Sequence, residues 1–114
     1  MKHYGLTIDL KDDPELIAQY KHHHANPWPE PLQGLREIGI TDMKIFLLGT
    51  RMFMYMTATD DFVAERDFPT YVEKNPKAAE WDGFMRTFQS QVSEAKEGEW
   101  WAEMEMVFDL HLHV

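Results

Sequence analysis

Residues 42–58 of the 114-residue chain read DMKIFLLGTRMFMYMTA, and this stretch decides the fold. It predicts two strands, 42–48 and 52–58, which the short turn Gly49-Thr50 joins into a hairpin. Large apolar side chains lie on both faces of each strand: Met43, Ile45 and Leu47 oppose Phe46 and Leu48 in the first, and Met52, Met54 and Met56 oppose Phe53 and Tyr55 in the second. Apolar side chains on both faces indicate a sheet that is covered on both. We therefore expect helices on one face and a second protein surface on the other.

The chain before the hairpin predicts a strand and a broken helix. Residues 2–10 alternate between apolar and polar positions, which is typical of a half-buried strand. Asp13 and Pro14 supply an N-cap and a first helical residue, and apolar positions follow at helical spacing. Three alternating prolines then push the residues before them out of helical geometry, so the helix should end near Ala25. A second helical segment runs to Gly39, which suits a left-handed cap.

The chain after the hairpin predicts one clear helix and one more strand. Residues 60–74 indicate a short helical turn followed by a loop. Asn75-Pro76 starts a helix. Its apolar stripe has the spacing i, i+3, i+4, i+7 and consists of Trp81, Phe84, Met85 and Phe88. Residues 93–98 are polar and indicate a loop, and the alternation in residues 103–112 predicts the last strand.

The predicted element order is βαββαβ with the first helix broken, which is the order of the ferredoxin-like plait, an α+β fold. The chain is long enough for one core and is expected to form a single domain, 1–114. Helices cover one face of such a sheet, so the second apolar face of the hairpin requires a partner. A homodimer packed sheet to sheet, of the dimeric α/β-barrel type, supplies that partner.

Composition excludes several kinds of partner. The chain has 11 basic and 20 acidic residues and a net charge of −9, which disfavours nucleic acid and anionic membrane surfaces. It has no apolar run long enough to span a membrane and no secretory signal pattern at its start, so we expect a cytoplasmic protein. The absence of cysteine removes disulfides, thiol nucleophiles and thiolate metal sites.

The segment around the three prolines is the candidate site. Tyr20 and His24 lie four residues apart on one helix face, so both are expected to touch a common ligand. The irregular backbone after Ala25 can aim Trp28 and Glu30 back toward His24. This arrangement would gather an imidazole, a phenol, an indole and a carboxylate in one concavity, which suits a small molecule.

A metal is not expected at the three consecutive histidines. The side chains of His22, His23 and His24 would point about 100° apart on a helix and cannot all bind one ion. Only His24 lies four residues from Tyr20. His111 and His113 share one face of the last predicted strand without a third ligand, and we interpret them as part of an exposed tail.

The motif Tyr-x-x-x-His-x-x-x-Trp-Pro-Glu at residues 20–30, with the Trp81 helix and the final Val107-Phe108, resembles the L-rhamnose mutarotase family. The resemblance covers residues 4–110. It implies small dimeric ferredoxin-like proteins that interconvert the two anomers of a 6-deoxy sugar without a cofactor. It also implies that His24 is the catalytic residue and that the substrate pocket is formed by Tyr20, Trp28, Glu30 and Trp81.

The end of the chain departs from the family pattern. Family members often have an acidic residue before Val-Phe and an aromatic residue or histidine after it, where this chain has Met106 and Asp109. The resemblance therefore implies a monosaccharide substrate, with L-rhamnose and L-fucose both open. In this interpretation His24 acts as acid or base in ring opening, and Tyr20 or a carboxylate is the second proton group.

Two other classes of function share this fold. One is a cofactor-independent oxygenase of the dimeric plait type, which lacks the Trp-Pro-Glu motif. The other is a noncatalytic dimer that binds a sugar without accelerating anomer exchange. Oxygen consumption with an aromatic substrate would identify the first, and sugar binding without catalysis the second.

Overall fold

The structure, a computed structural model, describes residues 1–113. Its sheet has the strand order β2-β3-β1-β4, β5 also pairs with β1, and each pairing is antiparallel. The strands are β1 Lys2–Leu10, β2 Ile40–Leu48, β3 Arg51–Ala58, β4 Gln89–Ser90 and β5 Ala102–Met104. This order confirms the predicted α+β ferredoxin-like plait. Its fourth strand is divided into β4 and β5, two short pieces along β1.

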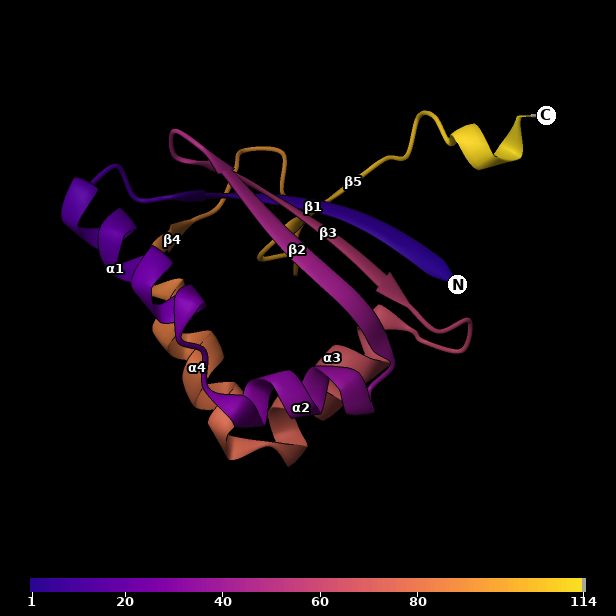
Figure 1. The fold of residues 1–114 in the computed structure, drawn as a ribbon, viewed down its shortest axis with the longest axis horizontal. Helices are drawn as coiled ribbons and strands as arrows, with labels where there is room; N and C mark the ends of the chain where they lie inside the picture. Colours follow the sequence, from indigo (N-terminus) through magenta and orange to yellow (C-terminus); the bar gives the residue numbers. More distant parts are fainter. Residues whose placement is uncertain (114) are drawn as a thin grey trace.

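The helices α1 to α4 form one layer on one side of the sheet (Figure 1). They are α1 Pro14–Ala25, α2 Pro29–Glu37, α3 Ala64–Lys74 and α4 Pro76–Arg86. The cap predicted for α1 forms, because the Asp13 carboxylate accepts from the backbone N–H of Glu15 at 2.9 Å. As predicted, α1 ends at Ala25 and the proline segment leads into a second helix. No helix within residues 1–113 is long and apolar enough to cross a membrane.

The core lies between the sheet and this helix layer and has two parts. One cluster joins β1 and β3 to α1 and α4, and consists of Ile8, Leu10, Tyr20, Met52, Met85 and Phe88. The other lies beside α2 and the start of α3, and consists of Ile40, Met56, Ala58 and Phe62. Each large apolar side chain buried here stabilises the fold by roughly 1.5–3 kcal/mol. The first cluster therefore fixes α1 and α4 on the sheet, which positions the candidate site.

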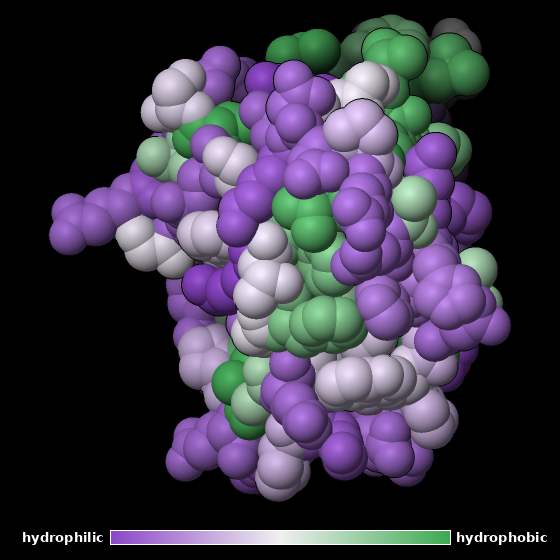
Figure 2. All heavy atoms as spheres, turned by 90° about the vertical axis from the view of Figure 1, so that its left-hand side faces the viewer, coloured by the Kyte–Doolittle hydropathy of each residue, from purple (hydrophilic) through white to green (hydrophobic). Residues whose placement is uncertain are grey.

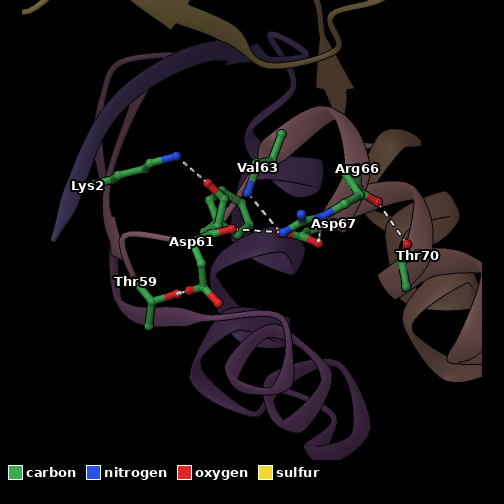
Figure 3. A network of polar contacts seen from close by, with 8 residues as sticks. Lys2, Thr59, Asp61, Val63, Arg66, Asp67 and Thr70 are labelled. Carbon is green, nitrogen blue, oxygen red and sulfur yellow. Dashed lines mark hydrogen bonds and ion pairs between the residues drawn. The ribbon is translucent and has the colours of Figure 1, made fainter.

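The helix α3 corrects the prediction of a short turn and loop for residues 60–74. Figure 3 shows the polar contacts that hold its first turn. The Asp67 carboxylate accepts from the backbone N–H of Val63 at 2.8 Å and pairs with Arg66 Nε at 2.9 Å. Pro69 inside the helix lowers its intrinsic propensity. These contacts, together with packing against the core, override that propensity.

The last strand is shorter than the predicted 103–112, and the prediction is wrong beyond Met104. β5 pairs with β1 in a register that sets Gly5 opposite Met104. β1 begins only three residues before Gly5, so this register offers no β1 partner to residues after 107. Residues 105–113 instead leave the sheet and project beyond it (Figure 1).

Candidate active site

Tyr20 and His24 lie one turn apart near the end of α1 and form the centre of the candidate site. Their rings stack, with centroids 4.1 Å apart and planes inclined by 28°. Tyr20 is only 4% exposed, and its other contacts include the edge of Phe88 at a centroid distance of 5.9 Å. His24 is half-buried above it. The i, i+4 spacing thus produces the contact expected from the sequence.

The surroundings of His24 fix its proton. Its Nδ1 atom lies 3.1 Å from the backbone carbonyl oxygen of Tyr20. A carbonyl only accepts, so Nδ1 carries the proton and Nε2 keeps a lone pair. Burial lowers the pKa of His24 below its ordinary 6.5, and this effect exceeds the rise caused by the hydrogen bond to Tyr20. The ring is therefore neutral at pH 7 and its Nε2 atom can take up a proton.

Two tryptophans extend the aromatic surface beside His24. Trp81 of α4 is half-buried, and its ring lies 5.6 Å from that of His24. Trp28, which precedes α2, meets Trp81 edge-on at 5.1 Å and lies nearly parallel to Phe84 at 6.3 Å. Four of the five residues predicted from the sequence, Tyr20, His24, Trp28 and Trp81, thus form one aromatic row.

Glu30, the fifth predicted residue, is exposed in the first turn of α2. Its backbone carbonyl accepts from Asn75 Nδ2 at 3.0 Å, and the Asn75 side chain also caps α4 by accepting from the backbone N–H of Ala78 at 3.0 Å. These described contacts connect Glu30 to the start of α4 and do not include His24. The backbone of Glu30 therefore helps to hold α2 against α4, and its carboxylate lies at the surface.

A hydrogen-bond chain that the sequence does not predict lies next to Tyr20. The indole N–H of Trp100 donates to Gln89 Oε1 at 2.7 Å, and Gln89 Nε2 donates to the Tyr20 hydroxyl oxygen at 3.3 Å. An indole only donates, so it sets the orientation of the Gln89 amide. Burial raises the pKa of Tyr20 to about 12, which keeps its hydroxyl protonated at neutral pH. Gln89 lies in a two-residue strand, where no periodic pattern exists to reveal it.

His23 also contacts the aromatic row, a contact that the sequence does not predict. Its ring meets Phe84 edge-on at a centroid distance of 4.8 Å. Residues three apart share a helix face, as residues four apart do, so His23 lies on the side of α1 that carries Tyr20. His22 is exposed on α1. Residues 1–113 contain no group of three His, Cys, Asp or Glu side chains that could hold a metal ion.

The helix layer leaves part of β2 uncovered. Ile45 and Leu47 pack against the core cluster on the helix side of the sheet but are only half-buried. Figure 2 shows the left-hand side of Figure 1, where hydrophobic side chains gather in the middle of a largely hydrophilic face. A neutral imidazole beside aromatic and apolar surface suits a small ligand that has both polar groups and C–H faces.

The fold and the site together define a class of small α+β plait proteins that hold a histidine in an aromatic setting at the end of the first helix. The chain belongs to the L-rhamnose mutarotase family, whose sequence model matches residues 3–110. This match confirms the resemblance seen in the motif at residues 20–30.

Two relatives of the whole chain are similar in sequence. An L-fucose mutarotase from Xanthomonas campestris pv. campestris is 34% identical over 116 residues, which cover 96% of this chain and 89% of that protein. A UPF0734 protein from Dictyostelium discoideum is 50% identical over 112 residues, which cover 96% of this chain and 90% of that protein.

Two solved structures share the fold at low sequence identity. An L-rhamnose mutarotase from Formosa agariphila has a TM-score of 0.68 at 20% identity, covering 96% of this chain and 98% of its own. The tetracenomycin F2 cyclase from Streptomyces glaucescens has a TM-score of 0.64 at 17% identity, covering 96% of both chains. Because one plait carries two unrelated chemistries, function has to be argued from the site.

Proposed function

We propose that this protein interconverts the α and β anomers of a 6-deoxy-L-hexose, L-rhamnose or L-fucose. It would be an isomerase of the aldose 1-epimerase type that works by proton transfer and needs no cofactor. The observation that carries the proposal is the neutral ring of His24, with Nδ1 held by the Tyr20 carbonyl and Nε2 keeping a lone pair. Membership of a sugar mutarotase family supports the substrate class.

The proposed reaction opens and recloses the pyranose ring. His24 Nε2 takes the proton of the anomeric hydroxyl while a second group delivers a proton to the ring oxygen and the bond between C1 and that oxygen breaks. The aldehyde then rotates, the hydroxyl formed from the former ring oxygen attacks the other face of C1, and both protons return. Sugars mutarotate slowly in water, so one acid/base group plus positioning groups suffices.

Tyr20 would support this chemistry without transferring the proton itself. Its pKa of about 12 and its contact with Gln89 favour a fixed hydroxyl, and its ring holds the imidazole by stacking. Trp28 and Trp81 would bind the C–H face and the methyl group of the sugar. Glu30, exposed two residues after Trp28, would accept hydrogen bonds from sugar hydroxyls.

The proposal includes a homodimer formed through the sheet face that the helices leave open. Phe46, Leu48 and Phe53 are exposed there, and an apolar face of this kind marks an interaction surface. The cytoplasmic location expected from the sequence stays a prediction.

Saturation-transfer NMR tests the proposed role of His24 by measuring exchange between the two anomeric proton signals of L-rhamnose or L-fucose at equilibrium. We expect His24→Asn to lower the enzymatic rate by about 10² to 10⁴, the usual contribution of a general acid/base. His22→Asn makes the same chemical change at an exposed position of α1 and should leave the rate unchanged. Wild-type exchange by His24→Asn would overturn the role assigned to this ring.

A further inference from the structure

The hydrogen-bond chain beside Tyr20 has only one possible direction. The Trp100 indole N–H only donates, so Gln89 Oε1, which lies 2.7 Å from it, must accept. A flipped amide would set two donors against each other at that distance. The amide nitrogen of Gln89 therefore faces the Tyr20 hydroxyl, and Nε2 donates to that oxygen at 3.3 Å. The neighbours of Gln89 thus fix the orientation of its amide.

The loop that carries Trp100 is itself held in place. The guanidinium group of Arg86, at the end of α4, lies over the indole ring at 4.8 Å from its centroid. The Glu99 carboxylate accepts from the backbone N–H groups of Lys96 at 2.8 Å and Glu103 at 3.2 Å. These contacts fix the loop before and after Trp100. The indole can therefore serve as a rigid start of the chain.

The chain ends at the ring that supports His24. Tyr20 is 4% exposed, so its hydroxyl group is shielded from bulk water. The helix α1 fixes one end of the side chain through the backbone, and the hydrogen bond from Gln89 holds the hydroxyl at the other end. Because both ends are held, the ring cannot tilt freely. The face of the Tyr20 ring is therefore a fixed surface.

His24 depends on this surface for its direction. Its Nδ1 atom donates to the Tyr20 carbonyl at 3.1 Å, and a single hydrogen bond leaves the imidazole able to swing about it. The stack on the Tyr20 ring, with centroids 4.1 Å apart, removes that freedom. The ring of Trp81 lies farther away, at 5.6 Å, and is inclined by 59°. The direction in which Nε2 points is thus set mainly by the plane of the Tyr20 ring.

We propose that Gln89 and Trp100 are positioning residues, which hold the Tyr20 ring and thereby aim His24 Nε2 at the reacting hydroxyl of the sugar. This inference rests on the proposed function for its effect on the rate, whereas the position of His24 can be measured without a sugar. An apolar side chain at position 89 would fill the same space and avoid the cost of burying an amide. It could not hold the phenol at its hydroxyl end, because that takes a directional contact. Buried, paired polar networks make a core rigid in this way.

Anomer exchange measured against sugar concentration tests the effect on the reaction. Gln89→Leu should lower kcat by roughly tenfold to 10², the size of effect that a small misplacement of a reacting group produces, and should leave KM within about twofold. Trp100→Phe keeps Gln89 but removes the donor that orients it, so it should lower kcat in the same direction by less. This milder variant decides the question if Gln89→Leu does not fold.

Two controls separate positioning from other effects. Gly39→Ala should destabilise the fold at a site away from the chain, because its Cβ would meet Thr59, and it should keep the parent kcat. Gln19→Leu makes the same chemical change as Gln89→Leu at an exposed position of α1 and should also keep the parent kcat.

The NMR signals of the imidazole nitrogens test the position of His24 in the absence of sugar. Among the signals of the six histidines, those of His24 are the ones missing from the spectrum of His24→Asn. The parent should show one tautomer, with the proton on Nδ1. In Gln89→Leu both tautomers should appear, and the pKa of His24 should move up toward 6.5, because a loosened ring is less well buried. Gly39→Ala should match the parent in both respects.

Tyr20→Phe shows whether Gln89 acts through the phenol. This substitution removes only the hydroxyl group, so the chain then ends at Gln89. Adding Gln89→Leu to Tyr20→Phe should change kcat by less than about twofold, because two changes along one chain are not independent. If the two losses multiply in full, Gln89 acts by another route and the proposal is overturned.

The remaining outcomes decide the proposal as follows. Parent kcat together with parent His24 signals in Gln89→Leu overturns the positioning role. An equal loss of kcat in Gly39→Ala overturns it too, because stability alone would then explain the effect. A raised KM with unchanged kcat in Gln89→Leu would assign Gln89 to binding instead. If the parent protein does not exchange anomers, the proposed function fails, and the imidazole signals still decide: two tautomers in Gln89→Leu support the positioning role, and one tautomer overturns it.

Discussion

A single substitution at Gln89 should destabilise the fold by breaking the hydrogen-bond chain beside Tyr20. Its side chain is 5% exposed and hydrogen-bonds both Trp100 Nε1 and the Tyr20 hydroxyl. Gln89→Leu preserves the approximate volume but leaves an indole N–H and a phenol oxygen without their partner. An orphaned buried group costs about 1–3 kcal/mol, and the Trp100 indole costs less because it is only half-buried, so we expect the free energy of unfolding to fall by about 2–4 kcal/mol.

Urea unfolding followed by far-UV circular dichroism measures this loss. The protein concentration is held constant, since association would otherwise shift the midpoint. With a urea dependence of about 2 kcal/mol/M, the midpoint should move by about 1–2 M. Gln19→Leu makes the same change at an exposed position of α1 and should stay within about 0.5 kcal/mol of the parent.

A double-mutant cycle makes the test specific to the hydrogen-bond chain. Trp100→Phe removes the indole N–H, so Gln89→Leu should cost less in that background than in the parent. The difference should be about 1 kcal/mol or more if the two side chains act together. A Gln89→Leu protein as stable as the Gln19→Leu control, or strictly additive changes in the cycle, would refute the reasoning.

Three further predictions concern the backbone, the titration of His24 and metal dependence. Gly39→Ala should destabilise the fold by about 1–3 kcal/mol, because Gly39 has φ +107° and a Cβ there would lie 2.6 Å from Thr59 Oγ1. Gly83→Ala, in the open interior of α4, should instead stabilise the fold by about 0.5–1 kcal/mol. Thermal unfolding of the two variants measures both effects. Because the pKa of His24 is lowered from 6.5, anomer exchange should persist at pH 6.5 and fall only at lower pH. As the pH falls, the His24 ring takes up a proton in the unfolded chain before it does so in the folded protein. The stability that the neutral ring contributes is therefore present above pH 6.5 and is lost as the pH falls toward the folded pKa. Exhaustive chelation should leave the exchange rate unchanged, and loss of rate with recovery on adding a divalent ion would contradict the proton-transfer chemistry.

Local signals in the sequence predicted most of the fold. Asp13-Pro14 marked the start of α1, the prolines after Ala25 marked its end, and the alternation of residues 42–58 gave the hairpin. These features act over a few residues, so a sequence pattern contains them. α3 was missed because distant packing overrides Pro69, and the last strand was overestimated because its length depends on how far β1 extends beside it.

In the candidate site, too, the sequence predicts the residues that local helix geometry brings together and misses those that only the tertiary fold brings together. Tyr20 and His24 were found because helix geometry alone brings residues four apart together. Gln89 and Trp100 were not found as partners, since they reach Tyr20 only when β4 and the loop before β5 fold beside β1. Glu30 had the right sequence neighbours, yet the contacts of its backbone are with Asn75.

The most direct test of the account is anomer exchange by the unmodified protein, measured by saturation-transfer NMR at neutral pH. Four sugars are compared: L-rhamnose, L-fucose, and their 6-hydroxy counterparts L-mannose and L-galactose. We predict acceleration for at least one 6-deoxy sugar above the spontaneous rate, and less for its 6-hydroxy counterpart, whose extra hydroxyl would lose water against an aromatic surface. Equal acceleration of all four would contradict recognition of the methyl group, and no acceleration of any would contradict the mutarotase function itself.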